Sequence, residues 1–237
     1  MGTNLMKTMM ALTVLVTAVP TTKAQDKVEV NLATDVVSQY IWRGQDLGDV
    51  SLQPTLGLGY KGLSLTAWGN VGLSDNDDTK EFDLTLGYSI GGFNIGITDY
   101  WFNTPDTRYF HYDAHSTSHV FEANVGYDFG FMALQWYTNF AGNDGVNKDG
   151  DRAYSSYFEI SAPFRLAWCD WTAAVGMVPY ATTSYGTNGF AVTNVAVKAT
   201  KDIKVTDHFS IPVFAGVMAN PCSQKAYFVC GLTLKAL

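Results

Sequence analysis

The chain has few charged residues and a shortage of bases. Charged residues make up 16% of its 237 positions, below the roughly 25% that is usual in soluble domains. Apolar residues reach 47% and aromatic residues 14%, which excludes an intrinsically disordered chain. The formal net charge is −7, so nothing in the bulk electrostatics supports a nucleic-acid partner, which would need clustered Lys and Arg.

Cysteine is also scarce, and long apolar runs are missing after the N-terminus. Cys169, Cys222 and Cys230 are an odd number, unlike the even, dense sets of disulfide-stapled domains. Cys222 and Cys230 could pair across a loop and a strand, but small apolar thiols are the simpler interpretation. No stretch after residue 24 has the about 20 apolar residues that a spanning helix needs.

The first 24 residues have the pattern of an export signal. Lys7 ends a basic start, Thr8 to Val19 is an uncharged and mostly apolar stretch, and Thr22-Lys23-Ala24 offers small residues for cleavage. This order is typical of a secretory signal peptide, and the stretch is too short for a transmembrane helix. We expect residues 1–24 to be removed after Ala24 and residues 25–237 to form one domain. An exported chain without a later spanning helix is either soluble or a membrane barrel.

Apolar and polar residues alternate along most of the remaining chain. In residues 82–90, Phe82, Leu84 and Leu86 lie on one side, and Asp83 and Thr85 lie on the other. Such alternation between two-residue glycine turns is typical of β-hairpins. Twelve strands are predicted, near 27–42, 51–60, 63–73, 82–90, 93–102, 119–129, 131–141, 154–162, 168–178, 190–200, 208–218 and 226–236.

The connections alternate between very short turns and long polar loops. Most strands have the length that crosses a membrane at a tilt, and an even number of strands with this loop pattern is typical of outer-membrane barrels. Aromatic residues flank the short turns, as an interfacial girdle would require: Tyr60, Tyr88, Phe93, Tyr127, Phe129 and Phe131. A second aromatic set lies near the long-loop ends: Tyr40, Trp42, Tyr100, Trp101, Trp136 and Tyr137.

Three residues depart from the pattern of the strands that contain them. Pro54 and Pro212 lie within predicted strands, where proline removes a ladder donor, so bulges are expected there. Asp99 falls on the apolar side of its strand, which suggests a slip in register near Thr98. The sequence thus predicts an all-β protein with a single antiparallel up-and-down transmembrane barrel, placed in the bacterial outer membrane.

One segment also resembles a known family. Ser38-Gln39-Tyr40-Ile41-Trp42-Arg43-Gly44 is similar to the S-x-Y-v-[FW]-R-G opening of the TorF-type porins, and residues 45–60 resemble that family's second strand. The resemblance implies an outer-membrane barrel with a pore role. Leu237 departs from the pattern, because barrels of this kind commonly end in an aromatic residue.

The side of each strand that faces the lumen is small and polar, with more acids than bases. By parity, the pore-lining residues would include Asp83, Glu122, Asn124, Glu159, Asp170 and Lys198, with Arg43 at the pore mouth. An excess of acids along a narrow aqueous path favours cations. A packed and closed lumen, in which these charges pair, is the alternative. Trp68, Tyr157 and Phe190 would either fill the lumen or offer rings on which a sugar or nucleoside stacks.

The loop at residues 103–118 leads into a set of histidines that forms a candidate metal site. His111, His115 and His119 are spaced by four, so helical turns would bring their imidazoles to one side, where a divalent metal could bind. A hydrated loop, or a loop folded inward as a constriction, explains the same residues. His119 with Ser116 or Ser118 is the one geometric candidate for a phospholipase-like pair, but no catalytic motif supports it.

The preferred function is therefore a porin-like channel. We expect passive diffusion of small hydrophilic solutes with weak cation preference, no enzymatic activity and no cofactor. The expected partners are outer-membrane lipid, the solutes themselves and the barrel-assembly machinery. The alternative is a closed structural or adhesive barrel whose extracellular loops bind a partner.

Overall fold

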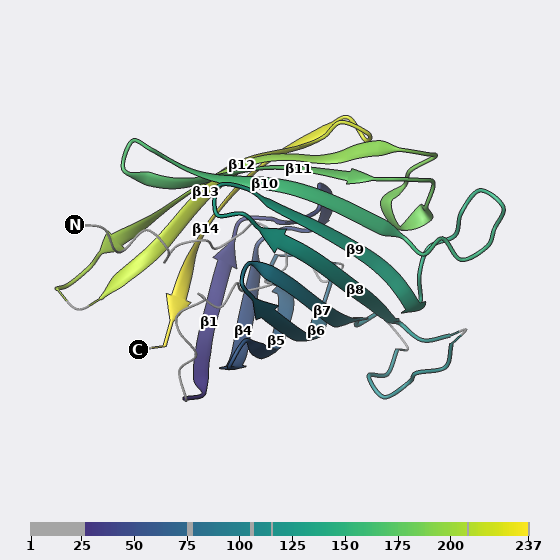
Figure 1. Cartoon of the computed structure of the whole chain (residues 1–237), viewed down its shortest axis with the longest axis horizontal. Helices are drawn as coiled ribbons and strands as arrows, with labels where there is room; N and C mark the ends of the chain where they lie inside the picture. Colours follow the sequence, from purple (N-terminus) through teal and green to yellow (C-terminus); the bar gives the residue numbers. More distant parts are fainter. Residues whose placement is uncertain (1–26, 75–77, 105–106, 115, 208, 237) are drawn as a thin grey trace.

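The chain folds into a closed barrel of twelve antiparallel strands (Figure 1). The computed structural model describes residues 27–74, 78–104, 107–114, 116–207 and 209–236; the predicted signal peptide and His115 lie outside them. In the order around the barrel the wall strands are β1 (Glu29–Val37), β14 (Lys225–Lys235), β13 (Ser210–Asn220), β12 (Ala191–Lys204), β11 (Cys169–Val178), β10 (Ser156–Leu166), β9 (Ala133–Gly142), β8 (His119–Asp128), β7 (Phe93–Phe102), β6 (Glu81–Ile90), β5 (Leu63–Gly72) and β4 (Ser51–Tyr60).

The predicted number of strands and their antiparallel order are confirmed. Each wall strand pairs with its neighbour in the chain, and β1 pairs with β14 to close the seam. Apart from the first strand, which is described below, the predicted ends differ most at two strands. β10 runs on to Leu166, where Ala167 and Trp168 turn the chain into β11, and β12 extends to Lys204. Among the described residues, no helix is long and apolar enough to cross a membrane.

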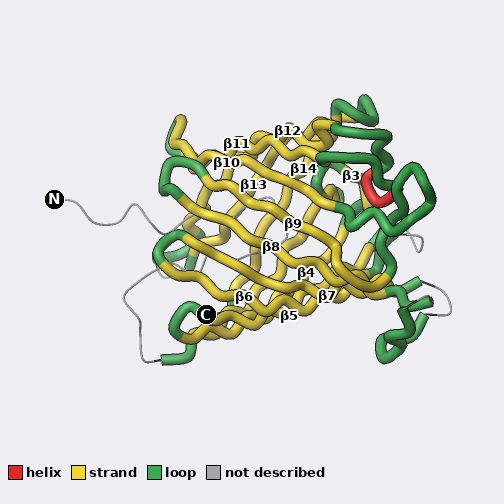
Figure 2. Tube along the Cα trace, turned by 45° about the vertical axis from the view of Figure 1, so that its right-hand side comes forward, coloured by secondary structure: helices red, strands yellow, loops and turns green. Residues whose placement is uncertain are grey.

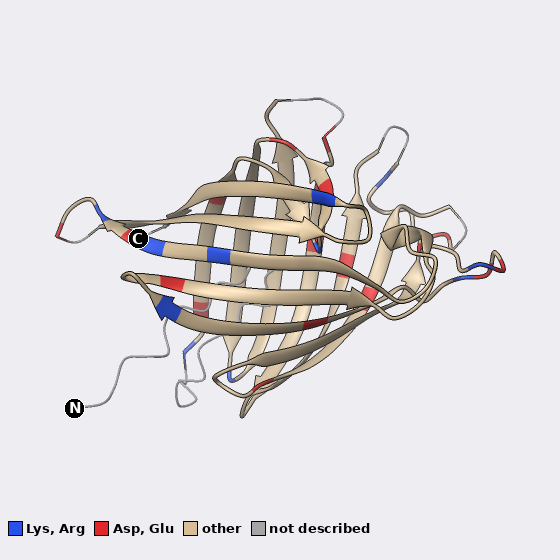
Figure 3. Cartoon of the chain, turned by 90° about the horizontal axis from the view of Figure 1, so that it is seen from above, with Lys and Arg blue, Asp and Glu red and all other residues tan. Residues whose placement is uncertain are grey.

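The barrel is apolar on its outer surface and polar inside. Along β6, Asp83 and Thr85 are buried, whereas Leu86, Tyr88 and Ile90 are exposed. The same alternation recurs in β7, where Asn94 and Thr98 are buried. This distribution is the reverse of a water-soluble domain and matches a wall that faces lipid. Charged residues accordingly gather at the ends of the barrel and within it (Figure 3).

The two ends of the barrel are built differently (Figure 2). At one end, two-residue turns such as Lys61-Gly62 and Gly91-Gly92 have positive φ at both positions, as the type I′ turns of tight hairpins require. The predicted aromatic girdle lines this end from β4 to the turn between β8 and β9, and all six of its rings are exposed. The long loops gather at the opposite end, together with a short 3₁₀ helix, η1 (Thr183–Tyr185).

The second aromatic set is divided between the two faces of the wall. Tyr40, Tyr100 and Tyr137 are buried inside the barrel, and the Trp42 ring packs on Tyr100 and Tyr185. Trp136 is exposed on the outside. The long-loop end therefore does not repeat the girdle of the other end, because most of its rings serve the interior.

The first predicted strand, 27–42, is too long. β1 ends at Val37, and residues 38–50 leave the wall to form the hairpin of β2 (Tyr40–Trp42) and β3 (Gln45–Gly48). Ser38 marks the departure: its amide donates to the Cys230 carbonyl at 2.8 Å, and its hydroxyl accepts from the Cys230 amide at 2.9 Å. The hairpin, called the inner hairpin below, pairs with no wall strand.

The expected irregularities at Pro54, Pro212 and Asp99 are absent. Pro54 and Pro212 keep the register of their neighbours without a bulge. β6 and β7 pair without a shift through Leu84 and Asp99, so Asp99 does point outward; its partner there is described below. The three cysteines, all within the described residues, are unpaired.

Candidate functional site

The inner hairpin extends into the interior, and its turn lies against β12 and β13. Its turn places Arg43 at φ 49° and Gly44 at φ 79°, the left-handed values that a type I′ turn needs. A Cβ on Gly44 would lie 1.9 Å from the Thr193 backbone oxygen of β12. The Asn220 side-chain amide of β13 donates to the Gly44 carbonyl at 3.1 Å. Only glycine allows so close an approach, so the Arg-Gly pair sets where the hairpin ends.

Arg43 is fixed by a buried ion pair with Glu122 of β8. Its two terminal nitrogens lie 2.6 and 2.9 Å from the two carboxylate oxygens, a bidentate arrangement that planar guanidinium favours. Arg43 also donates to the Tyr185 hydroxyl at 2.6 Å. Burial alone would lower the pKa of Arg43, but the charge of Glu122, the hydrogen bond to it and the hydroxyls of Tyr185 and Tyr100 together outweigh burial and hold that pKa well above its usual value. The guanidinium therefore stays charged inside the barrel.

Aromatic rings surround this guanidinium on several sides. Its central carbon lies 4.4 Å from the centroid of Trp42, 4.0 Å from that of Tyr137 and 4.7 Å from that of Tyr157, within the range of cation–π attraction. Tyr185 stacks on both Trp42 and Tyr157, with centroids 5.9 Å apart in each case. The cluster of Trp42, Tyr137, Tyr157 and Tyr185 is called the Arg43 cage below.

Tyr185 reaches this cage from a long loop rather than from the wall. The 3₁₀ helix η1 begins after Thr182, whose hydroxyl accepts from the Ser184 amide, and ends at Gly186, at φ 62°. The Thr182 hydroxyl also lies 2.5 Å from that of Ser155. These bonds hold the turn so that Tyr185 points inward, and burial raises the pKa of its hydroxyl. Two loops at this end, residues 38–50 and 179–190, thus meet inside the barrel.

A second cluster lies on the other side of the inner hairpin. The Tyr40 hydroxyl donates to Glu81 of β6 at 2.9 Å, and its ring packs on Trp68 of β5, with centroids 5.6 Å apart. Asp83 follows Glu81 on the same inner face of β6 and is 1% exposed. Tyr100 of β7 donates to Glu122 at 2.9 Å, so it lies between this cluster and the Arg43 cage.

Most of the predicted pore-lining residues lie inside the barrel at the long-loop half. Asp83, Glu122, Asn124 and Glu159 are all buried. Glu159 accepts from the Tyr157 hydroxyl at 2.8 Å. Several of these side chains already have hydrogen-bond partners within the protein. That they line a water path remains a prediction.

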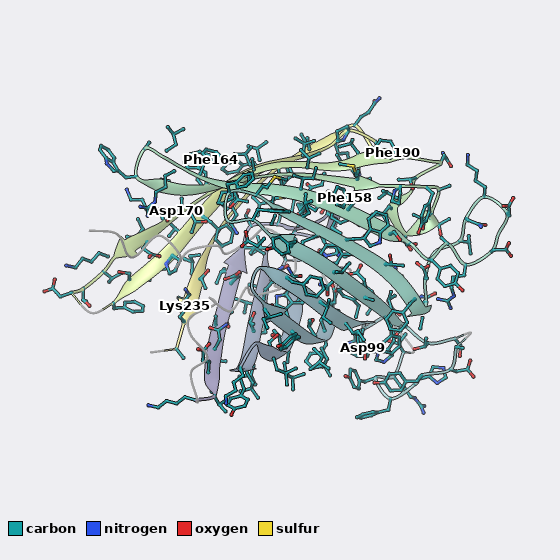
Figure 4. All side chains as sticks on the ribbon, viewed as in Figure 1. Asp99, Phe158, Phe164, Asp170, Phe190 and Lys235 are labelled. Atoms are coloured by element: carbon teal, nitrogen blue, oxygen red, sulfur yellow. The ribbon has the colours of Figure 1, made fainter. Side chains whose placement is uncertain are left out.

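The remaining predicted site residues are placed differently. Asp170 pairs with Arg165 at 2.6 Å near a short turn, toward the end away from Asp99 (Figure 4). The Lys198 amine lies 4.0 Å from the centroid of Phe214. Arg43 is 3% exposed and lies inside the barrel rather than at its mouth, because the inner hairpin folds inward. Phe190 is 67% exposed, so it contributes no ring to the interior.

The histidine-bearing loop folds over the outside of the barrel instead of into it. His119 points outward from β8 and is fully buried under this loop, with Nδ1 2.7 Å from the Asp99 carboxylate and Nε2 2.6 Å from the Tyr109 carbonyl. The Tyr112 ring covers it, with centroids 4.3 Å apart. The outward position of Asp99 is therefore explained by His119, its partner on the next strand.

This arrangement offers no metal site in the part of the chain that is described. Both ring nitrogens of His119 face protein atoms, and Nε2 of His111 lies 2.7 Å from the Ser116 hydroxyl. No group of three or more His, Cys, Asp or Glu side chains in that part is placed to hold a metal ion. His115 lies outside the described residues.

Sequence reasoning missed Tyr185 and Glu81. The long polar loop around Tyr185 has no period that would indicate its direction. Glu81 was detectable, because it shares the parity of Asp83; starting the strand at residue 82 left it in the preceding loop.

Comparison with known proteins adds little to this description. No family model matches the chain, and no curated protein is similar to it in sequence. Among solved structures, that of OmpF of Salmonella typhi in complex with daunomycin is similar, with a TM-score of 0.36 and 10% identity over 89% of this chain and 98% of that chain. The barrel architecture is established here by the strand pairing of the chain itself.

Proposed function

We propose that this chain is an outer-membrane barrel that lets small hydrophilic solutes pass through a narrow, weakly cation-preferring path limited by the inner hairpin. The observation that carries the proposal is the reversed burial: apolar side chains cover the outer wall, whereas polar and acidic side chains fill the interior. Such a wall suits lipid outside and water or polar solutes inside. The inner hairpin, fixed by Arg43 and Glu122, then sets the width of the path.

The route to the membrane belongs to the same proposal. Residues 1–24 would direct export and be removed after Ala24, and the barrel-assembly machinery would insert residues 25–237 into the outer membrane. The motif at residues 38–44 supports membership of the TorF-type porins. The Arg-Gly pair of this motif also has a physical role, because Arg43 binds Glu122 and Gly44 fits against Thr193.

A closed barrel with binding loops is the second candidate, and one observation favours it. The interior holds a hairpin whose tip bonds to β8 and β13 and lies against β12, and whose Trp42 ring stacks on Tyr185 from another loop. A path then remains only beside the hairpin. If the barrel is closed, its outer loops, including the exposed Phe110, would contact a partner.

Conductance separates the two functions. The refolded mature protein would be measured in a planar bilayer across a KCl gradient, beside a variant in which a short Gly-Ser linker replaces residues 39–48. We expect small conductance steps with a cation-selective reversal potential, and larger steps without the hairpin. Silence of both proteins, each folded as judged by a heat-dependent gel shift, would refute the channel and favour the closed barrel.

A further inference from the structure

Two neighbouring carboxyl groups inside the barrel lack the counter-charge that Glu122 has. Glu81 and Asp83 stand two residues apart on the inner face of β6. In the ladder with β5, Asp83 is opposite Trp68 and Glu81 is opposite Asn70. Arg43, the buried base of the interior, is committed to Glu122 by both of its terminal nitrogens. Glu81 accepts a hydrogen bond from Tyr40, and its carboxyl group lies within hydrogen-bond reach of Asp83.

Asp83 is the more exceptional of the two. Neither of its buried carboxylate oxygens accepts a hydrogen bond from a donor among the described residues; the group within hydrogen-bond reach is the Glu81 carboxyl, itself an acid. Its strongest charge interactions are with Glu81, Asp99 and Glu122, which are all acids. An ionised carboxylate in such a place is costly unless a positive group or a proton joins it.

The surroundings of this pair are suited to a cation. The rings of Tyr40 and Trp68 pack beside it, and Tyr100 is opposite Asp83 in the ladder with β7. Aromatic faces attract cations electrostatically. The described residues hold no set of three or more acidic, His or Cys ligands, whereas divalent metals usually need a larger ligand set. Two carboxylates between rings, without a larger ligand set, therefore favour a singly charged cation over a divalent metal.

We propose that Glu81 and Asp83, flanked by Tyr40 and Trp68, bind a small monovalent cation inside the barrel. This site deepens the proposed function, since it assigns the cation preference to one place on the wall. Binding does not require conduction, so the site can be tested without a channel recording. A proton shared between the two carboxyl groups is the competing explanation.

The test is the thermal unfolding of the refolded mature chain in detergent, at pH 7.5, in KCl and in N-methyl-D-glucamine chloride of equal ionic strength. A ligand that binds only the folded state raises the midpoint. We expect the wild-type midpoint to be several degrees higher in KCl, because the large organic cation does not enter the site. Asp83→Asn should abolish that difference and unfold at a higher temperature than wild type in N-methyl-D-glucamine.

The matched control is Glu159→Gln, which also neutralises a buried interior acid but one that has a hydroxyl partner in Tyr157. It should retain the wild-type dependence on potassium. A wild-type midpoint that is equal in both salts would overturn the proposal and favour the shared proton. Loss of the dependence in both variants would also overturn it, since the effect would then follow total charge.

Two further outcomes keep the test decisive. If Asp83→Asn does not fold, wild type alone is compared in lithium, sodium, potassium and ammonium chloride; a site gives an order by ion, whereas equal midpoints refute it. A barrel that is silent in bilayers but stabilised by potassium would support the site and refute only the channel. A conducting barrel with no potassium effect would refute only the site.

Discussion

The ion pair between Arg43 and Glu122 makes a quantitative prediction about stability. Arg43→Met removes the guanidinium but keeps much of the stem that packs in the Arg43 cage. The change leaves the buried Glu122 carboxylate with Tyr100 as its remaining hydrogen-bond donor. Removing one partner of a buried pair costs about 3–5 kcal/mol, largely because the other charge is left uncompensated. We therefore expect Arg43→Met to lower the free energy of unfolding by that amount.

The double variant Arg43→Met/Glu122→Gln tests the reason for that loss. Glutamine keeps the shape of Glu122 without its charge, so the uncompensated charge disappears. Residues in direct contact show interaction energies of about 0.5–3 kcal/mol in such cycles. We expect a coupling near the upper end, because both side chains are buried and the contact is bidentate. The double variant should be more stable than Arg43→Met alone.

The assay is equilibrium unfolding in urea in lipid vesicles, followed by tryptophan fluorescence, which reports on Trp42 beside the guanidinium. Arg165→Met is the control, since its pair with Asp170 is largely exposed and such pairs contribute only about 0–1 kcal/mol. Additive single effects, within about 0.5 kcal/mol, would refute the idea that the buried pair fixes the inner hairpin.

Three other perturbations test separate parts of the structure. Gly44→Ala should displace the inner hairpin and enlarge the conductance steps, because its Cβ would meet a backbone oxygen. Gly130→Ala is the control, since Gly130 also has a positive φ but nothing within 4 Å of its Cβ position. Equal conductance of the two variants would contradict the close contact at Gly44. Asp99→Ala should free the outer loop and speed tryptic cleavage at Arg108, measured by mass spectrometry, and unchanged cleavage would count against the bond to His119. Leu86→Arg should cost about 2–4 kcal/mol in vesicles, because Leu86 is exposed on the outer wall, while no loss would mean that this face does not meet lipid.

The strands of the wall and their inward faces could be predicted because the alternation that encodes them is local in the sequence. Alternation of period two assigns each residue of a strand to one face, so the inward positions of Asp83, Glu122 and Glu159 followed from parity alone. The ends were less accurate where no glycine marks the turn, as at Ala167 and Trp168, both of which adopt positive φ. Proline kept its register in β4 and β13 because the ladder tolerates a missing donor at single positions.

The interior was not predictable for the opposite reason. Arg43 is bonded to residues 79 and 142 positions away in the chain, Glu122 and Tyr185, and no local pattern encodes those contacts. Parity placed Asp99 correctly on the outside, but an acid on the apolar face suggested a slip in register. The reason for its position, the bond to His119, lies on the next strand and is not visible in the local pattern. The sequence left open whether the loop at 103–118 folds inward, and the structure places it outside. The inner hairpin, predicted as the end of a wall strand and an outer loop, lies within the barrel.

The inner hairpin also has a consequence for the order in which the barrel assembles. It leaves the wall beside the seam of β1 and β14, where Ser38 is bonded to Cys230, yet its tip rests on β8, β12 and β13. These supports lie later in the chain, so the hairpin is synthesised early but has nowhere to dock until the sheet has curled round. Its docking therefore requires strands as late in the chain as β12 and β13, so a seated Arg43 marks a barrel in which these strands are already in place.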